Sequence, residues 1–474
     1  MRDTEEASSV FSFTLTLNSQ ARIPMYEQLY GAIAAAIRDG SLQKGEKLPS
    51  KRELCTHLGI SRSTVENAYE LLRSEGYVEA RPRSGFYAAD YISLTPDPKR
   101  RRSVPLPPAP QHASDLHSSP LSTSAVDVSL FPYASWAKLY KEVVYNSPEL
   151  LQRGDPRGEL SLRQALSRLL REYRGVRCTP EQLVIGSGLE TLTEQLVTLL
   201  GSDAVYAMED PGYPALERVL LARGRSIRSV PMDAQGMNAE ALERSGATVA
   251  YLTPSHQFPL GITMPASRRS RLLRWAVEGN GWIIEDDYDS EFRYGGRPIS
   301  SMQGMDRHER VIYAGTFSRS LAPAIRLAYL VLPPALLGRW QKLFGRQQAT
   351  VSRYEQRVMA RFLKEGFYAR YLRRVGKLYS DRRAALLRGL DTIDGATVSG
   401  AEGGIHFLLT LPHFSEAELL SRAAAAGIPL RGLSEYCRNS PPLPSTLVVG
   451  YGGLPTAQVE TVVQTLRQAW SAPD

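Results

Sequence analysis

The stretch Val311-Ile-Tyr-Ala-Gly-Thr-Phe-Ser-Arg-Ser-Leu-Ala-Pro-Ala-Ile-Arg-Leu-Ala-Tyr-Leu-Val-Leu-Pro333 begins with an apolar run and continues into a loop rich in hydroxyl groups. The apolar run predicts a buried strand. In the loop, the hydroxyls of Thr316 and Ser318 and the guanidinium of Arg326 are donors that can converge on one anion, as such groups do on a phosphate. The stretch therefore predicts a strand that leads into an anion-binding loop.

A second apolar strand is expected earlier in the chain, and acidic residues follow it directly, in the segment Trp282-Ile-Ile-Glu-Asp-Asp-Tyr-Asp-Ser-Glu-Phe292. From residue 127 onward, short apolar strands alternate with amphipathic helices, which predicts an α/β fold with a mostly parallel sheet covered on both faces. The expected strands are 182–185, 204–208, 248–251, 282–285, 311–313 and 328–332. Ligands on such sheets bind at the carboxyl ends of the strands.

The residues that follow these strands can build such a site. The backbone N–H groups of Gly188 and Leu189 begin a helix and can hold a phosphate. Tyr213 could stack on a flat ring, and His256 could supply a hydrogen bond. Asp286 could pair with a ring nitrogen. Each residue also has a plain structural role open to it, with Tyr213 in the core, His256 satisfied within its loop and Asp286 capping a helix.

The N-terminal segment, residues 20–90, predicts a small helical domain. Apolar residues spaced four apart over 24–39 indicate an amphipathic helix. Ser50 and Glu53 form a capping-box pattern that starts a second helix. A third helix is expected over 61–75, with Arg62, Ser63 and Thr64 at its exposed N-terminal end.

Two short strands, 77–80 and 86–88, flank the basic tip Arg81-Pro-Arg-Ser-Gly85 and complete a winged-helix pattern. Residues 48–87 closely resemble the DNA-binding domain of the GntR class of bacterial regulators. The resemblance implies that these residues contact the operator: Arg52, Ser61, Arg62, Ser63, Thr64, Arg81, Arg83 and Ser84. The alternative is that they are solvated charges on a small helical domain.

Composition limits the class of protein. A chain of 474 residues with 43% hydrophobic residues predicts two or three domains. We expect no membrane span, because no apolar run approaches the ~20 residues that a span needs. We expect no signal peptide, because the chain starts with the mostly polar residues Met1-Arg-Asp-Thr-Glu-Glu. Cys55, Cys178 and Cys437 are too far apart for a disulfide framework or a metal cluster, which is typical of a cytoplasmic protein.

The formal net charge of +8 suggests polyanionic partners, but its distribution does not single out the N-terminal segment. Residues 1–90 carry 11 Lys and Arg against 12 Asp and Glu. Residues 91–126 contain the basic run Lys99–Arg102, then proline and serine, and predict a flexible linker. That run could contact DNA phosphates or be a solvated patch. The case for DNA binding therefore depends on the placement of the basic residues.

The two halves together resemble the MocR subfamily of GntR regulators, in which a winged helix is fused to an aminotransferase-like domain of the fold-type I, pyridoxal 5'-phosphate (PLP) class. The hallmark segments are Glu209–Pro214, Thr253–Pro259, Glu285–Tyr294 and Gly315–Ser318. The resemblance implies a transcription regulator that binds PLP and responds to the vitamer or to an amino compound. It also implies a head-to-tail homodimer. Residues 127–474 would form the effector-binding and dimerisation domain, with a large part at 127–333 and a small part at 334–474.

The resemblance assigns the pyridinium nitrogen to Asp286 and the ring hydroxyl to Tyr288, and it places the Schiff-base lysine directly after Ser318. Here that residue is Arg319. A guanidinium stays protonated, with its lone pairs delocalised, so it cannot form the imine or relay a substrate proton. The family also holds the substrate carboxylate with an arginine in a late strand, and the matching residues 446–453 have none, although Arg431 or Arg438 could substitute.

Three functions remain open at this point. The first is a regulator that binds PLP or a PLP–amine adduct without a covalent bond. The second is a regulator that has lost PLP and clamps another anion with Arg319. The third is a working aminotransferase, which the missing lysine disfavours.

Overall fold

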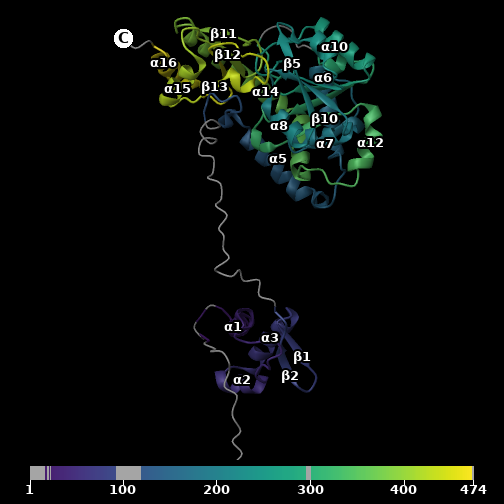
Figure 1. Cartoon of the computed structure of the whole chain (residues 1–474), viewed down its shortest axis with the longest axis vertical. Helices are drawn as coiled ribbons and strands as arrows, with labels where there is room; N and C mark the ends of the chain where they lie inside the picture. Colours follow the sequence, from purple (N-terminus) through teal and green to yellow (C-terminus); the bar gives the residue numbers. More distant parts are fainter. Residues whose placement is uncertain (1–16, 19–20, 22, 92–118, 295–299, 472–474) are drawn as a thin grey trace, which may run out of the picture. The chain divides into compact units, whose positions relative to one another are not determined.

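The computed structural model describes residues 17–18, 21, 23–91, 119–294 and 300–471. The chain divides into two compact units, Met1–Pro108 and Ala109–Asp474. Figure 1 draws both units in colours that follow the sequence. The basic run Lys99–Arg102 and most of the expected linker lie outside the described residues.

The first unit is a winged helix. Its elements are α1 (Met25–Asp39), α2 (Lys51–Leu58), α3 (Arg62–Ser74), β1 (Val78–Arg81) and β2 (Gly85–Ala88). The expected capping box is present, because the Ser50 side chain accepts from the Glu53 N–H and the Glu53 carboxylate accepts from the Ser50 N–H. Leu29 and Ile33 of α1 share a core with Val65 and Leu72 of α3, and all four are fully buried. Strands β1 and β2 pair antiparallel and form the wing.

The second unit is built on an eight-stranded sheet, as the alternation of strands and helices predicts. Its strands are β3 (Leu183–Gly186), β4 (Val205–Asp210), β5 (Ser226–Asp233), β6 (Gly236–Met237), β7 (Val249–Leu252), β8 (Trp282–Asp287), β9 (Val311–Thr316) and β10 (Ala328–Val331). They lie in the order β3-β10-β9-β8-β7-β4-β5-β6. The five neighbours from β9 to β5 run parallel, and β10 is antiparallel to both of its neighbours. Sequence reasoning missed β5 and β6.

Helices cover both faces of this sheet (Figure 1). The side chains of β3 show why, since Leu183 and Ile185 join one core and Val184 joins the other. The first core contains α5 (Tyr133–Asn146), α6 (Leu160–Arg174), α13 (Arg353–Lys364) and α14 (Phe367–Leu390). The second core contains α7 (Leu189–Leu200), α8 (Pro214–Ala222) and α12 (Pro334–Phe344). A smaller cluster contains α9 (Ala239–Arg244), α10 (Ala266–Glu278) and α11 (Met302–Met305).

A second, four-stranded antiparallel sheet follows toward the C-terminus. Its elements are β11 (Thr397–Ser399), β12 (His406–Thr410), β13 (Arg431–Gly432) and β14 (Thr446–Gly450), with α15 (Glu416–Ala425) and α16 (Val459–Ala469). The expected division at residue 333 is too early. Trp340 of α12 and Val358 of α13 are buried in the cores of the large sheet, so both helices belong with that sheet.

The expected linker also ends earlier than residue 126. Leu121 is buried at 1% exposure, and its carbonyl accepts a hydrogen bond from the Gly450 N–H at the end of β14. Residues 119–126 are therefore part of the second unit, because they hydrogen-bond to the end of β14. Among the described residues, no helix is both long and apolar enough to span a membrane.

Candidate functional site

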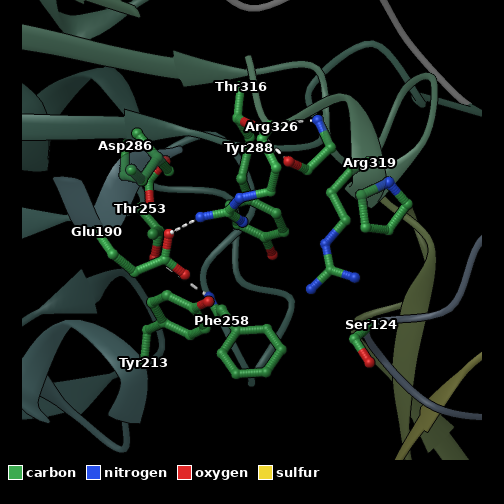
Figure 2. A pocket seen from close by; sticks show the side chains of 13 residues that line it. Ser124, Glu190, Tyr213, Thr253, Phe258, Asp286, Tyr288, Thr316, Arg319 and Arg326 are labelled. Carbon is green, nitrogen blue, oxygen red and sulfur yellow. Dashed lines mark hydrogen bonds and ion pairs between the residues drawn. The ribbon is translucent and has the colours of Figure 1, made fainter. Parts of the chain in front are cut away.

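A cavity of about 210 Å³ lies where the carboxyl ends of the parallel strands meet. Strand β7 is followed directly by Thr253, β8 carries Asp286 near its end, and β9 ends at Thr316. Figure 2 shows side chains from these strands converging with others from α7 and from the loop after β9. The cavity is lined by Ser124, Leu189, Glu190, Tyr213, Thr253, Phe258, Asp286, Tyr288, Thr316, Ser318, Arg319, Pro323 and Arg326.

Asp286 is the buried acid of this cavity. The Tyr251 hydroxyl donates to its Oδ2 atom, whereas its Oδ1 atom is buried and has no hydrogen-bond partner among the described residues. Burial raises the pKa of Asp286 to about 7. A buried carboxylate oxygen without a donor is costly. Because Asp286 lines the cavity, a ligand that brings its own N–H donor would supply the missing partner.

A second part of the cavity lining carries the expected phosphate donors. Thr316 Oγ1 lies 3.0 Å from Ser318 Oγ and accepts from the Ser318 N–H at 3.1 Å. Arg326 reaches over Gly188, the residue before α7, and donates to the Ser187 carbonyl at 3.2 Å. A Cβ on Gly188 would lie 2.2 Å from Arg326 Nη2, and Gly188 has φ +100°, so this close approach requires glycine.

Aromatic rings form one wall of the cavity. Phe258 packs edge-on against Tyr213, with ring centroids 5.7 Å apart, and against Tyr288 at 6.2 Å. The Tyr288 hydroxyl donates to the His256 carbonyl at 3.0 Å. His256 was expected in the cavity, but it does not line it: its ring is buried and its Nδ1 lies 3.0 Å from Asp289.

Arg319 lines the cavity at the position where the resemblance expects the Schiff-base lysine. Figure 2 shows its guanidinium extending into the cavity. It forms no hydrogen bond or ion pair with any residue that the structure describes. The guanidinium is therefore available to an anionic or hydrogen-bond-accepting group of a ligand.

The late strand offers no replacement for the carboxylate-binding arginine. Val448 of β14 is buried in an apolar cluster with Phe258 and Tyr436, next to the cavity. Arg431 pairs with Glu435 at 2.7 Å, and Arg438 pairs with Glu217, so neither arginine is directed to the cavity as an unpaired cation. Within the described cavity lining, a ligand's carboxylate has only Arg319 and Arg326 to bind.

The other expected interface is the N-terminal end of α3. Ser61 caps this helix by accepting from the Thr64 N–H at 3.2 Å, and its hydroxyl lies 2.9 Å from that of Ser63. The Arg62 side chain is 80% exposed, and its Nε lies 3.1 Å from Glu66. Arg52 of α2 is also exposed. The cap therefore presents these side chains on the surface of the first unit.

The wing tip holds three further exposed residues of the expected interface, Arg81, Arg83 and Ser84. Tyr87 positions two of them, because Arg81 lies 4.1 Å from the centre of its ring and Ser84 Oγ lies 2.6 Å from its hydroxyl. Sequence reasoning did not single out Tyr87.

Five residues of the cavity were also missed: Ser124, Glu190, Thr253, Phe258 and Pro323. The sequence does mark Glu190, because it is an acidic residue in the first turn of a helix whose N-terminus was expected to bind an anion. Thr253 and Phe258 lie within a hallmark segment but were not assigned, and Pro323 lies in the anion-binding loop. Ser124 lies in the segment taken as linker, where nothing in the local pattern indicated a cavity.

Comparison with known proteins assigns both units. The profile of the bacterial regulatory proteins of the gntR family matches residues 25–88, and that of aminotransferase class I and II matches residues 121–466. The chain is 37% identical to the uncharacterized HTH-type transcriptional regulator YdeL of Bacillus subtilis, over 96% of this chain and 98% of the relative. It is 33% identical to the probable rhizopine catabolism regulatory protein MocR of Rhizobium meliloti, over 97% and 96%.

The chain belongs to the MocR-type GntR regulators. Its aminotransferase-like fold is also that of solved enzymes. The structure of LysN, an α-aminoadipate aminotransferase from Thermus thermophilus complexed with N-(5'-phosphopyridoxyl)-L-leucine, matches with a TM-score of 0.65 and 26% identity. The match covers 73% of this regulator and 90% of LysN.

Proposed function

We propose that this regulator binds operator DNA through its winged helix and uses the cavity to sense PLP, or a PLP–amine adduct, without a covalent bond. It acts in the cytoplasm, where its operator lies, and it is not an enzyme. The observation that carries the proposal is the pairing of two features in one cavity: the Asp286 oxygen that lacks a donor and the arginine at position 319.

The residues present fit PLP as a non-covalent ligand. Asp286 Oδ1 would accept from the protonated ring nitrogen, and Tyr213 and Phe258 would flank the ring. Thr316, Ser318 and the N-terminus of α7 would hold the phosphate. LysN, which shares the fold, is solved with a phosphopyridoxyl–amino acid adduct, and this supports an adduct as one form of the ligand.

When bound, PLP supplies an electron sink to a reaction only if a base can move the substrate's proton. The residue at that position is an arginine, which stays protonated at neutral pH. Arg319 can therefore orient a carboxylate or an aldehyde oxygen, but it cannot accept a proton. Because residues 446–453 contain no arginine, the substrate carboxylate also lacks its usual partner. Binding without turnover is the expected behaviour.

Titration of the purified full-length chain with PLP tests the proposal. We expect the fluorescence of the protein to change saturably as PLP is added. After borohydride treatment, we expect no pyridoxyl group to be fixed to the chain. An absorbing species that borohydride fixes to the chain would contradict non-covalent binding. Sequencing the DNA retained at moderate salt, with and without PLP, identifies the operator and shows whether the ligand changes its occupancy.

A second candidate is a regulator that has lost PLP and binds another anion. The observation that favours it is the guanidinium of Arg319, which has no hydrogen bond or ion pair within the part of the chain that the structure describes. This candidate predicts no PLP binding in the same titration. It also predicts that a small carboxylate quenches the fluorescence of the protein, and that this quenching is lost in Arg319→Gln.

We further propose that the regulator is a homodimer, arranged head to tail. Large apolar side chains are unusually exposed over one stretch of the second unit. Of the twelve such side chains among the described residues, six lie between Val128 and Leu160: Val128, Tyr133, Val144, Tyr145, Leu151 and Leu160. A concentration of this kind is typical of a surface that a second subunit covers.

A further inference from the structure

The phosphate end of the cavity already contains a carboxylate. Glu190, in the first turn of α7, lies with its Oε2 atom 2.9 Å from Nη2 of Arg326. Figure 2 marks this ion pair with a dashed line. Both side chains line the cavity and are about half exposed, 45% for Glu190 and 50% for Arg326.

The backbone holds Arg326 in this place. Arg326 follows the short 3-10 turn Pro323–Ile325 and has a left-handed backbone, with φ 49°. Its guanidinium lies close to Gly188, where an added Cβ would be 2.2 Å from Nη2 unless the arginine side chain moved. Glu190 is in the first turn of α7, so the positive end of that helix lies beside the ion pair, and no side chain caps it. Glu190 therefore occupies a position where an anionic ligand would gain from both Arg326 and the helix.

The charge state of Glu190 agrees with this role. Burial raises its pKa, but the hydrogen bond from Arg326 and one from the backbone lower it by more, so the net pKa lies below the ordinary value for glutamate. The carboxylate is thus ionised at neutral pH. Arg319, by contrast, has no acidic partner among the described residues. The cavity has one arginine that an internal acid neutralises and one that is unpaired.

We propose that Glu190 is an internal competitor for the ligand's phosphate, which has to displace it from Arg326. This inference rests on the proposed function and deepens it. A phosphate carries close to two negative charges, and it would repel a carboxylate held against the same guanidinium. Glu190 thereby weakens the binding of phosphorylated ligands and leaves unphosphorylated ones unaffected, which keeps the effector exchangeable.

Glu190→Gln tests the inference, because glutamine keeps the shape of the side chain and removes its charge. We expect the affinity for PLP and for inorganic phosphate to rise roughly tenfold, the scale of a half-exposed pair of charges. The affinity for pyridoxal, which has no phosphate, should not change. Isothermal titration calorimetry on the full-length chain measures all three. A merely structural role for Glu190 would lower the affinities rather than raise them.

Glu194→Gln is the matched control. Glu194 lies one turn further along α7 and pairs with Arg223 at 2.9 Å, with an exposure of 46%, but it does not line the cavity. We expect no change in any affinity. In the double variant Glu190→Gln/Arg326→Gln the gain should disappear, because the competitor acts only through Arg326.

The outcomes separate this inference from the proposed function. If PLP binds the parent and Glu190→Gln equally well, Glu190 does not compete and the inference is wrong, while PLP sensing stands. If neither protein binds PLP but the variant binds inorganic phosphate more tightly, the inference stands and PLP sensing is wrong. If neither protein binds PLP and both bind phosphate equally, both are wrong.

Discussion

The side chain of Arg319 decides whether the cavity can hold PLP covalently. It lies in the loop after β9 and enters a cavity whose other residues suit a phosphorylated pyridine ring. Lysine and arginine are not equivalent there, since only the amine has a lone pair for the aldehyde carbon. A single substitution thus distinguishes a cavity that binds its ligand reversibly from one that holds it covalently.

Arg319→Lys should convert the site into a covalent one. With PLP added, we expect a yellow Schiff-base form, and borohydride should fix the pyridoxyl group to the new lysine, as peptide mass spectrometry detects. Arg326→Lys is the control, because it places an amine in the same cavity at the phosphate end. A colourless Arg319→Lys protein in the presence of PLP would show that this cavity is not the PLP site.

Asp286 gives the site a pH dependence. Its folded-state pKa is raised from 3.8 to about 7, so the folded state holds the proton more tightly than the unfolded state does. The stability it contributes is fully present below about pH 4 and is lost as the pH rises through about 7. An asparagine side chain cannot ionise. As the pH rises from 5 to 8, the free energy of unfolding of Asp286→Asn should therefore gain about 1–3 kcal/mol relative to that of the parent.

Thermal unfolding of both proteins without ligand, measured across that pH range, checks this expectation. Asp203→Asn, at an exposed aspartate in the same unit, should track the parent at every pH. If the difference in unfolding temperature between Asp286→Asn and the parent were the same at every pH, Asp286 would ionise normally. The same variant should also bind PLP more weakly, because an amide stabilises the pyridinium less than a carboxylate does.

At the scale of single elements, α3 is the segment on which the proposed recognition of DNA depends. Its N-cap Ser61 holds the first turn, and Arg62 extends from that turn into solvent. Residues 1–90, which contain the winged helix, have no excess of basic residues, so placement rather than bulk charge has to supply the affinity for DNA.

Arg62→Ala should reduce operator affinity by about 1–3 kcal/mol if Arg62 contacts a base. Arg73→Ala is the matched control. Arg73 is also an exposed arginine of α3 and pairs with Glu70 as Arg62 pairs with Glu66, but it lies in the last turn. Fluorescence anisotropy measures the affinity of each variant for the recovered operator and for a scrambled duplex. An equal loss on the two duplexes would show that Arg62 contacts only phosphate.

At the scale of the whole molecule, the exposed apolar side chains between Val128 and Leu160 are the strongest indication of a partner subunit. Leu151 is 79% exposed, so an aspartate there should not disturb the fold of the subunit. Leu151→Asp should weaken dimerisation by roughly tenfold or more if the residue is near the centre of the interface.

Sedimentation at several concentrations measures the dimer. Leu221→Asp, at an apolar residue of α8 that is 50% exposed, controls for the added charge. If Leu151→Asp dimerises as tightly as the parent, this stretch does not form the interface.

The sequence predicted the fold of each unit because its signals are local. Periodic apolar residues and caps such as Ser50 placed α1 to α3, and apolar runs placed six strands of the large sheet. It missed β5, whose residues are largely exposed or half-buried and give no continuous apolar run. The division at residue 333 was wrong, because which sheet α12 and α13 cover depends on packing and not on their own pattern.

For the site, the sequence by itself indicated the loops after the strands, but not the segment that holds Ser124, and it determined that position 319 holds a guanidinium and not an amine. Only the tertiary structure decided how those loops meet. It turned His256 away from the cavity toward Asp289, left one oxygen of Asp286 without a donor, and joined Arg326 to Glu190 across 136 positions of chain. The physical reason is that hydrogen bonds and ion pairs between distant segments depend on distances that the fold sets, whereas helix and strand patterns depend on neighbours along the chain.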